Sequence, residues 1–199
     1  MVNLTTYQEI KVEPFELDHI EVFKITKVPN QHSKLVLTGI LPEDTEDSYV
    51  EKALAEKNIK VIVETEEDSK IIFCGLIQTI EVSTRASTYC LEIEAISHSV
   101  SLDIERVRRS YQDLSMLYSD LMIKAVERYD GDVMDKVTDE TTIDNFILQY
   151  DETPWEFVMR MASRFNVPIS RKINLKSLRC MQGFPKEMKL ANWMTLLTR

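Results

Sequence analysis

The chain has 199 residues, a mass of 23.2 kDa and a formal net charge of −9. This length allows one large domain or two small ones with a real hydrophobic core, which excludes a small scaffold held together by disulfides. The excess of acidic residues opposes a broad electrostatic grip on nucleic-acid phosphates or anionic lipids. We therefore expect a folded protein without a sequence-specific nucleic-acid partner.

Neither a membrane span nor a secretory signal is expected. The longest apolar stretch, residues 71–80, is broken by polar residues and is far shorter than the roughly 20 residues of a membrane-crossing helix. Residues 1–12 are polar and charged throughout and lack a basic end followed by an apolar run. The chain is expected to be made in the cytoplasm and to have no membrane anchoring.

The first half of the chain has the pattern of β-strands. Strands are predicted at 20–28, 34–41, 59–64, 71–82 and 87–96, where β-branched residues are dense and no helical period occurs. Residues 83–86 lack apolar bulk and are predicted to form the turn before the last strand. Apolar residues change phase within 71–82, which predicts a β-bulge near Gln78, with Gly75 permitting a sharp bend. Residues 43–57 fit either a short helix or an acidic loop, at the surface in both cases.

After Ser101 the apolar period becomes helical. Apolar residues recur three and four apart from Leu114 to Tyr129, which predicts an amphipathic helix that is capped by Asp113 or Ser115 and ends at Gly131. This helix offers Met116, Leu117, Met122 and Tyr129 either to an internal core or to a partner.

A second helix is predicted from its start signals. Thr153, Pro154 and Glu156 supply an N-cap, a first-turn proline and the glutamate of a capping box. Trp155, Val158, Met161, Ala162 and Phe165 form its apolar face. Residues 146–150 are predicted to be a strand or a turn of helix. We divide the chain near Ile104 into a β domain, 1–104, and a mixed α/β domain, 105–199, so that the fold class is β-rich α+β.

Residues that could carry chemistry have simpler interpretations. His19, His32 and His98 are isolated and lie in no metal-binding motif, so no metal site is predicted. Cys74, Cys90 and Cys180 fit neither a disulfide framework nor a zinc site, and Cys74 and Cys90 are expected to fill sheet positions. No phosphate-binding or dinucleotide-binding glycine motif is present, so no cofactor is expected.

Charged clusters have both a structural and a functional interpretation. Asp151, Glu152 and Glu156 could be the acid and base of a hydrolase, but carboxylates are also favoured at a helix start. A basic concentration could contact phosphate or could neutralise neighbouring carboxylates. Its members are Arg106, Arg108, Arg109, Lys124 and Arg128.

Five short runs occur in an order that resembles a known family. They are Phe73-Cys74-Gly75-Leu76-Ile77, Tyr89-Cys90-Leu91-Glu92-Ile93, Ser97-His98-Ser99, Arg109-Ser110-Tyr111-Gln112 and the nine residues from Gln149 to Phe157. Together they resemble the baseplate hub family of contractile injection systems, which includes VgrG of type VI secretion, phage late control protein D and the hubs of tail-like bacteriocins. The run from Gln149 to Phe157 is the most specific. The resemblance covers roughly half of the chain.

The resemblance implies a virion structural protein with no catalytic, cofactor or metal residues. In the family a β-barrel like the tail-tube subunit precedes a mixed α/β domain, and three copies form a ring. The implied role is a trimeric symmetry adapter between a hexameric tail tube and a trimeric spike, in contact with other baseplate subunits. The implied location is a tail baseplate or injection particle, made in the bacterial cytoplasm. The residues implied to define the structure by packing, turning and capping are Gly75, Tyr89, Gln112, Gln149, Tyr150, Glu152, Trp155 and Phe157.

Two features depart from the family pattern. Family hubs are longer, so the chain resembles their N-terminal portion, from which a complete sixfold ring is not expected. Residues 177–199 do not continue the pattern, and an altered end would expose Trp193, Leu196 and Leu197. Two other functions stay open: a hydrolase acting on the cell wall, and a monomeric binding adaptor.

Overall fold

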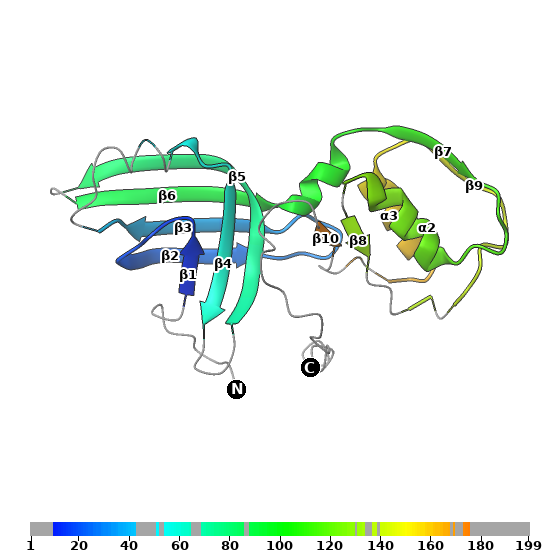
Figure 1. Ribbon diagram of the computed structural model, residues 1–199, viewed down its shortest axis with the longest axis horizontal. Helices are drawn as coiled ribbons and strands as arrows, with labels where there is room; N and C mark the ends of the chain where they lie inside the picture. The colour runs from blue at the N-terminus through cyan, green and yellow to red at the C-terminus, as the bar shows by residue number, and fades with distance from the viewer. Residues whose placement is uncertain are drawn as a thin grey trace.

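The molecule has two parts, a curled sheet and a smaller unit of helices and short strands (Figure 1). The computed structural model describes residues 10–42, 51, 54–64, 69–85, 88–129, 131–133, 137–138, 140–167, 169 and 173–175. A short 3-10 helix, η2 (His98–Asp103), connects the two parts. No helix in the described ranges is long and apolar enough to cross a membrane.

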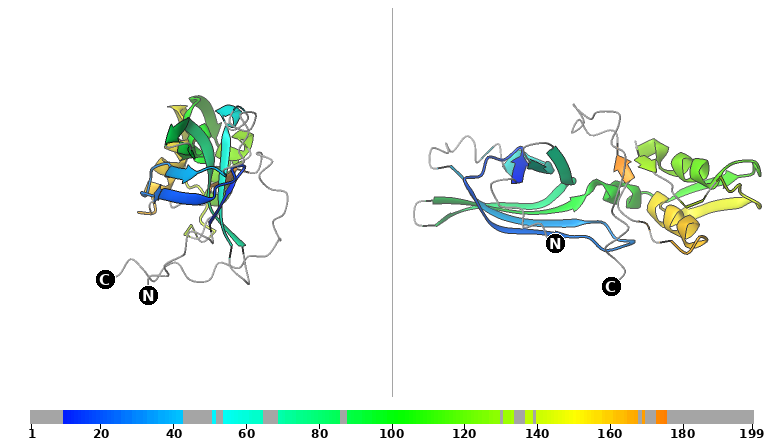
Figure 2. Two further views of the ribbon diagram at one scale, coloured as in Figure 1. Left: turned by 90° about the vertical axis from the view of Figure 1, so that its left-hand side faces the viewer. Right: turned by 90° about the horizontal axis from the view of Figure 1, so that it is seen from below.

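The first part is a six-stranded antiparallel sheet in the order β1-β4-β5-β6-β3-β2. Its strands are β1 (Ile10–Glu13), β2 (His19–Thr26), β3 (Lys34–Ile40), β4 (Asn58–Glu64), β5 (Ser69–Arg85) and β6 (Thr88–Ser97). β1 and β2 are its edges and do not pair with each other in the described ranges, so the sheet is a curled half-barrel (Figure 2). The antiparallel arrangement was predicted, whereas the strands that the structure describes do not close into the expected barrel.

Alternation of side chains builds the core of the sheet. Leu35 and Leu37 on β3 and Leu91, Ile93 and Ala95 on β6 point inward and are almost fully buried. The predicted bulge is confirmed, because the register of β5 against β6 shifts between Ile77 and Thr79. β5 bends sharply along its length, so that its two ends pair with different strands, β4 and β6 (Figure 1).

Gly75 lies next to this bend, and its lack of a side chain is required there. A Cβ at this position would collide with the backbone carbonyl oxygen of Ile96 on β6. The close approach of two backbones therefore explains the glycine better than any unusual backbone torsion.

Two expectations for the first half need correction or completion. The turn predicted at 83–86 is wrong for its first three residues. They continue β5 and pair with β6, and the last pair of this ladder is Arg85 with Thr88. β1 was not predicted, because four residues are too few to show a period. Within 43–57, Glu51, Leu54 and Ala55 are helical and exposed, while 43–50, 52 and 53 lie outside the described residues.

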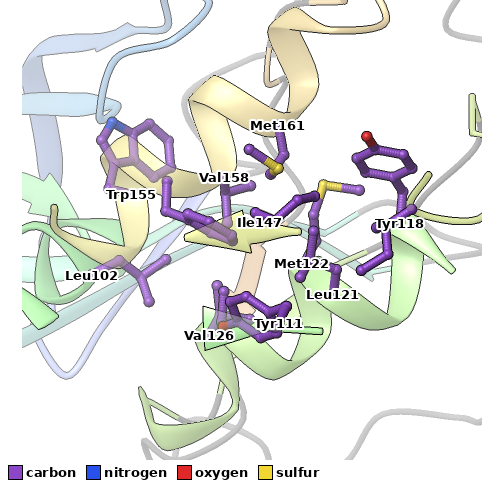
Figure 3. Close-up of a cluster of buried hydrophobic side chains, with 13 residues drawn as sticks. Leu102, Tyr111, Tyr118, Leu121, Met122, Val126, Ile147, Trp155, Val158 and Met161 are labelled. Carbon is purple, nitrogen blue, oxygen red and sulfur yellow. The ribbon is translucent and has the colours of Figure 1, made fainter. Parts of the chain in front are cut away.

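The second part packs helices against one face of a two-stranded ribbon. The ribbon pairs β7 (Val107–Tyr111) with β9 (Ile147–Glu152), so the strand alternative for 146–150 is correct. The other elements are α2 (Tyr118–Val126), the 3-10 helix η3 (Glu127–Tyr129), α3 (Pro154–Ser163) and a pair formed by β8 (Gly131–Val133) and β10 (Ile173–Leu175). Side chains from α2, α3 and the ribbon converge in one core, with Ile147 at its centre and Trp155 at its edge (Figure 3).

The first helix begins later than predicted. α2 starts at Tyr118, its N-cap is Leu117, and no side chain caps it. Asp113 instead accepts hydrogen bonds from the backbone and hydroxyl of Ser115, which forms a local turn. Backbone pairing wins over helix propensity here, because Leu117 bridges Thr142 and the amide of Ile143 donates to Met116.

The second helix has the predicted start. Thr153 is the N-cap of α3, its hydroxyl accepts from the amide of Glu156, and the carboxylate of Glu156 accepts from the amide of Thr153. Pro154 occupies the first turn, and Trp155, Val158 and Met161 are buried. The capping box therefore fixes where the buried face of α3 begins.

Candidate assembly surfaces and the joint between the two parts

The loop between β2 and β3 reaches across to the second part. Asn30 at its tip has a positive φ of 60°. Its side-chain oxygen accepts from the amide of Ile169 at 2.8 Å, and its own amide donates to the carbonyl of Ile169 at 3.2 Å. Asparagine is one of the few residues that tolerate a positive φ. At this position it therefore allows the tight turn and also supplies the side-chain oxygen that contacts Ile169.

His32 is the centre of this joint. Its Nδ1 lies 2.9 Å from the hydroxyl of Ser99, and its Nε2 lies 3.5 Å from a carboxylate oxygen of Asp103. Its ring packs against Trp155 with a centroid distance of 4.5 Å. Three elements distant in sequence, the β2–β3 loop, η2 and α3, therefore meet at one side chain, and Figure 3 shows Trp155 at the edge of the second core.

Hydrogen bonds extend the joint on both sides of His32. The amide of Ser33 donates to the hydroxyl of Ser97, which lies 2.8 Å from the hydroxyl of Ser99. The hydroxyl of Thr153 donates to Asp103 at 2.6 Å, which ties the start of α3 to η2. Ser99, His32 and Asp103 are the residue types of a nucleophilic triad. Here, however, Ser99 also contacts the hydroxyl of Ser97, and Asp103 also accepts from Thr153. These contacts connect the two parts, so a structural role accounts for the three residues.

The carboxylates considered for a hydrolase are all engaged. Glu152 forms two bonds of 2.9 Å with Arg160. Glu156 serves the capping box and lies 3.5 Å from Arg106. Asp151 is 3.8 Å from Arg108. Each carboxylate has an arginine partner: Glu152 joins β9 to α3, Glu156 joins α3 to the segment before β7, and Asp151 lies beside β7 within the ribbon, so structural roles account for all three.

The basic concentration is also distributed among internal partners. Arg106 donates to the carbonyl of Asp151, and Arg109 donates to the carbonyls of Lys124 and Ala125 in the last turn of α2. Arg128 lies 3.7 Å from Glu105. The four arginines therefore have carboxylate or carbonyl partners within the chain, while Lys124 lies on the exposed side of α2.

The apolar stripe of α2 is mainly part of the core. Met122 is buried, while Met116, Leu117 and Tyr129 are partly buried. A shallow hollow of about 390 Å³ lies on the opposite side of α2. It is lined by Asp113, Ser115, Met116, Asp120, Ile123, Lys124 and Glu127.

The residues implied by the resemblance have several structural roles. Gln149, Trp155 and Phe157 are buried, and Phe157 stacks on Tyr111 at 5.6 Å. Arg160 joins Glu152 to the carbonyl of Leu148. Tyr89 is partly buried against the first core. Gln112 and Tyr150 are exposed, so neither packs in a core.

The positions of the described histidines and cysteines are explained by structural roles. His98 is buried on η2, and burial holds its pKa below the ordinary value. His19 is exposed on β2. Cys74 lies in β5 and Cys90 in β6, as predicted, and Cys180 lies outside the described residues, as do all of 177–199. No three metal-ligating residues gather in the part of the chain that the structure describes.

Two exposed surfaces were not predicted. The first, the outer face of the sheet, is the side opposite the first core and carries Val22, Val36, Glu81, Glu92 and Glu94. The second, the ribbon face, is the side of β7–β9 opposite the second core and carries Arg108, Ser110, Leu148 and Tyr150. The two valines, Leu148 and Tyr150 are large apolar residues exposed on these faces. Alternation in β9 was the signal that could have shown the ribbon face.

Comparisons with known proteins connect this fold to tail proteins. The 43 kDa tail protein of prophage MuSo2 from Shewanella oneidensis is similar over 80% of this chain and 48% of its own, with 12% identity and a TM-score of 0.55. The E. coli c3393 protein is similar over 77% of this chain and 42% of its own, with 14% identity and a TM-score of 0.52. The latter is described as a component of the type VI secretion system with structural similarity to the T4 tail proteins gp27 and gp5. No protein family and no curated sequence matches the chain.

These similarities show a shared fold. The chain spans less than half of the length of either structure. One neighbour is a phage tail protein and the other a secretion-system component, and this chain shares with them a β-rich fold with a curled antiparallel sheet.

Proposed function

We propose that the chain is a structural baseplate hub protein of a phage tail or a related contractile injection system. The observation that carries the proposal is the curled sheet followed by the helix-and-ribbon unit, shared with two tail-related structures over more than three quarters of this chain. The order of motifs from Phe73 to Phe157 supports the same family independently.

In this proposal the sheet is the tube-like part and the helical unit is the second hub domain. We place the boundary near Ile104, with 1–104 and 105–199 as the two domains. Three copies form a trimeric adapter between a hexameric tail tube and a trimeric spike, in contact with other baseplate subunits. The protein is made in the bacterial cytoplasm, acts in the particle and catalyses no reaction.

Localisation within particles tests this function. Antibody against the chain, visualised by gold labelling of purified tails, is expected to mark the baseplate end of the tube. Deleting the coding sequence is expected to abolish assembled tails, and supplying the chain in trans to restore them. Tails that assemble normally without the chain would overturn the proposal.

The hydrolase alternative is tested by Glu152→Gln. In the hub function this change weakens the contact with Arg160 and affects folding or assembly only. Release of peptidoglycan fragments by the wild-type chain, lost in a correctly folded Glu152→Gln variant and kept in Glu127→Gln, would instead establish a hydrolase. Glu127 is a matched control because it is exposed at the end of α2.

The monomeric adaptor is disfavoured by the packing of α2. That function needs the surface around Leu117 and Met122 to be open to a partner, whereas Met122 is buried in the second core. Slow hydrogen exchange across α2 in the isolated protein is the expected result, and fast exchange would favour the adaptor.

A further inference from the structure

Like charges face each other on the outer face of the sheet. The register pairs Glu81 of β5 directly with Glu92 of β6, and Glu94 is the next outward residue on β6. Directly opposed like charges destabilise a sheet. Arg85 lies 2.9 Å from Glu92, but Glu81 and Glu94 have no ion-pair partner among the described residues. Of these three neighbouring carboxylates, Glu92 alone has an arginine partner among the described residues.

Apolar side chains extend this acidic patch toward β2. Val36 is the cross-strand neighbour of Glu94, and Val22 is the neighbour of Thr38, which itself pairs with Glu92. Val22 and Val36 are 46% and 37% exposed. The outer face therefore combines uncompensated negative charge with exposed apolar area, which is the composition of a contact surface for a basic and apolar partner.

The ribbon face of the same chain has the complementary composition. The Arg108 side chain is 68% exposed, and its guanidinium group lies 4.8 Å from the centre of the Tyr150 ring. Tyr150 and Leu148 are 60% and 44% exposed on consecutive outward positions of β9. Tyrosine and arginine are enriched in protein interfaces because they combine apolar area with directional bonds.

Secondary charges follow the same complementarity. Asp151 lies beside Arg108 on the ribbon, 3.8 Å away. On the sheet, Lys24 is the cross-strand neighbour of Val36 on the side opposite Glu94. Each surface therefore has acidic and basic groups beside exposed apolar side chains. Negative charge dominates on the outer face of the sheet, whereas Arg108 is the most exposed charged group named on the ribbon face.

We propose that the ribbon face of one copy of this chain packs on the outer face of the sheet of a second copy, with Arg108 opposite Glu81 and Glu94. The inference rests on the proposed trimer and deepens it by naming the surfaces in contact. One surface lies on the six-stranded sheet and the other on the β7–β9 ribbon, in different parts of the elongated molecule (Figure 1). The contact is therefore head-to-tail, and such contacts close into rings when the rotation between copies allows it.

Charge reversal tests the contact on the full chain. We expect the wild type to be a trimer by light scattering across a range of protein concentrations. Glu81→Lys with Glu94→Lys, and separately Arg108→Glu, should each raise the protein concentration needed for trimer formation by about tenfold or more. Glu127→Lys and Arg128→Glu are the matched controls, because they reverse exposed charges outside both surfaces.

Combining the reversals Glu81→Lys, Glu94→Lys and Arg108→Glu in one chain gives the decisive result. The two introduced lysines of one copy would then face the introduced glutamate of the next, so the triple variant should recover trimer formation at a concentration close to that of the wild type. Circular dichroism checks that each variant is folded. A monomeric wild type, a triple variant no better than the single-surface variants, or equal loss in the controls would overturn the contact.

The outcomes separate this inference from the proposed function. Gold labelling at the baseplate together with an unrescued triple variant would leave the hub function standing and refute this contact. A rescued trimer from a chain that is absent from tails would do the reverse. Trimers insensitive to every reversal would mean that a different surface joins the copies.

Discussion

The two parts of the molecule bury their apolar residues in different ways. The six-stranded sheet curls around its own core, which comes almost wholly from alternating strand residues such as Leu37 and Ile93. The second part has only a two-stranded ribbon, so its core depends on α2, α3 and η2 lying against one side of that ribbon. An isolated two-stranded ribbon is at best marginally stable in water. This difference means that the second part depends more strongly on single large side chains and on its contacts with the sheet.

The largest effect should come from deleting one aromatic ring in the second core. Phe157→Ala removes a fully buried ring that stacks on Tyr111, and should lower the free energy of unfolding by about 3–5 kcal/mol. In a Trp193→Phe background, Trp155 is the only tryptophan, so its fluorescence reports the unfolding of the second part in urea.

A cavity in the core of the sheet provides the comparison for Phe157→Ala. Leu37→Ala should cost about 2–5 kcal/mol, reported by far-ultraviolet circular dichroism. If the two parts differ as described, Phe157→Ala shifts the fluorescence transition more than the circular dichroism transition. Coincident transitions in both variants would mean that the parts unfold as one unit.

A smaller effect than either core cavity should occur at Gly75, where the backbones of β5 and β6 approach closely. Gly75→Ala places a Cβ against the carbonyl of Ile96, and should destabilise the sheet by about 1–3 kcal/mol. Gly39→Ala is the control, because its Cβ would first meet the end of the flexible Leu17 side chain at 2.9 Å and would lie 3.1 Å from the carbonyl oxygen of His19, compared with 2.2 Å between a Cβ at Gly75 and the carbonyl oxygen of Ile96. Equal urea midpoints for the two variants would contradict the backbone collision.

Removing His32 tests how far the second part depends on the sheet. His32→Ala deletes the contacts with Ser99, Asp103 and Trp155, at an expected cost of about 1–3 kcal/mol in the free energy of unfolding. Small-angle scattering should show a wider range of orientations between the two parts. Ser99→Ala removes only one of these contacts and should have a smaller effect, and a scattering curve unchanged by His32→Ala would argue against the joint.

A smaller effect is expected at the start of α3. Thr153→Ala removes both the cap and the bond to Asp103 and should cost about 1 kcal/mol or slightly more. Thr153→Ser keeps a hydroxyl group and should recover most of the loss. A serine variant as unstable as the alanine variant would mean that the methyl group matters more than the cap.

The smallest effect should be the pH dependence contributed by His98. Burial lowers the pKa of this histidine in the folded state, so the unfolded chain binds the proton more tightly. The stability that His98 contributes is therefore present above the unfolded pKa of about 6.5 and is lost as pH falls toward the folded pKa. His98→Leu should flatten the fall in urea midpoint between neutral and mildly acidic pH, and an unchanged pH profile would contradict this.

Most of the sheet could be predicted because one buried face imposes a period of two. The bulge near Gln78 was predictable for the same reason, since an added residue changes the phase of Ile77 and Ile80. The start of α2 was not, because the segment before it gains backbone bonds to 141–143 that no local pattern reveals. The start of α3 was predictable because its capping box is entirely local.

The joint and the two exposed faces could not be predicted from the sequence. His32 contacts η2 and α3 residues that are distant along the chain, so no local pattern around it indicates its role. The facing of Glu81 and Glu92 requires the register, which depends on the bulge and on the length of β5. Local patterns predict elements, whereas these surfaces depend on how the elements pair.

The contact between Asn30 and Ile169 joins residues 139 positions apart. During synthesis, the sheet strands have all left the ribosome well before Ile169 is added to the chain. The hairpin that carries Asn30 must therefore keep its shape for some time without its partner. Because domains generally fold in the order of synthesis, the sheet is expected to present Asn30 as a preformed docking point for the backbone of Ile169.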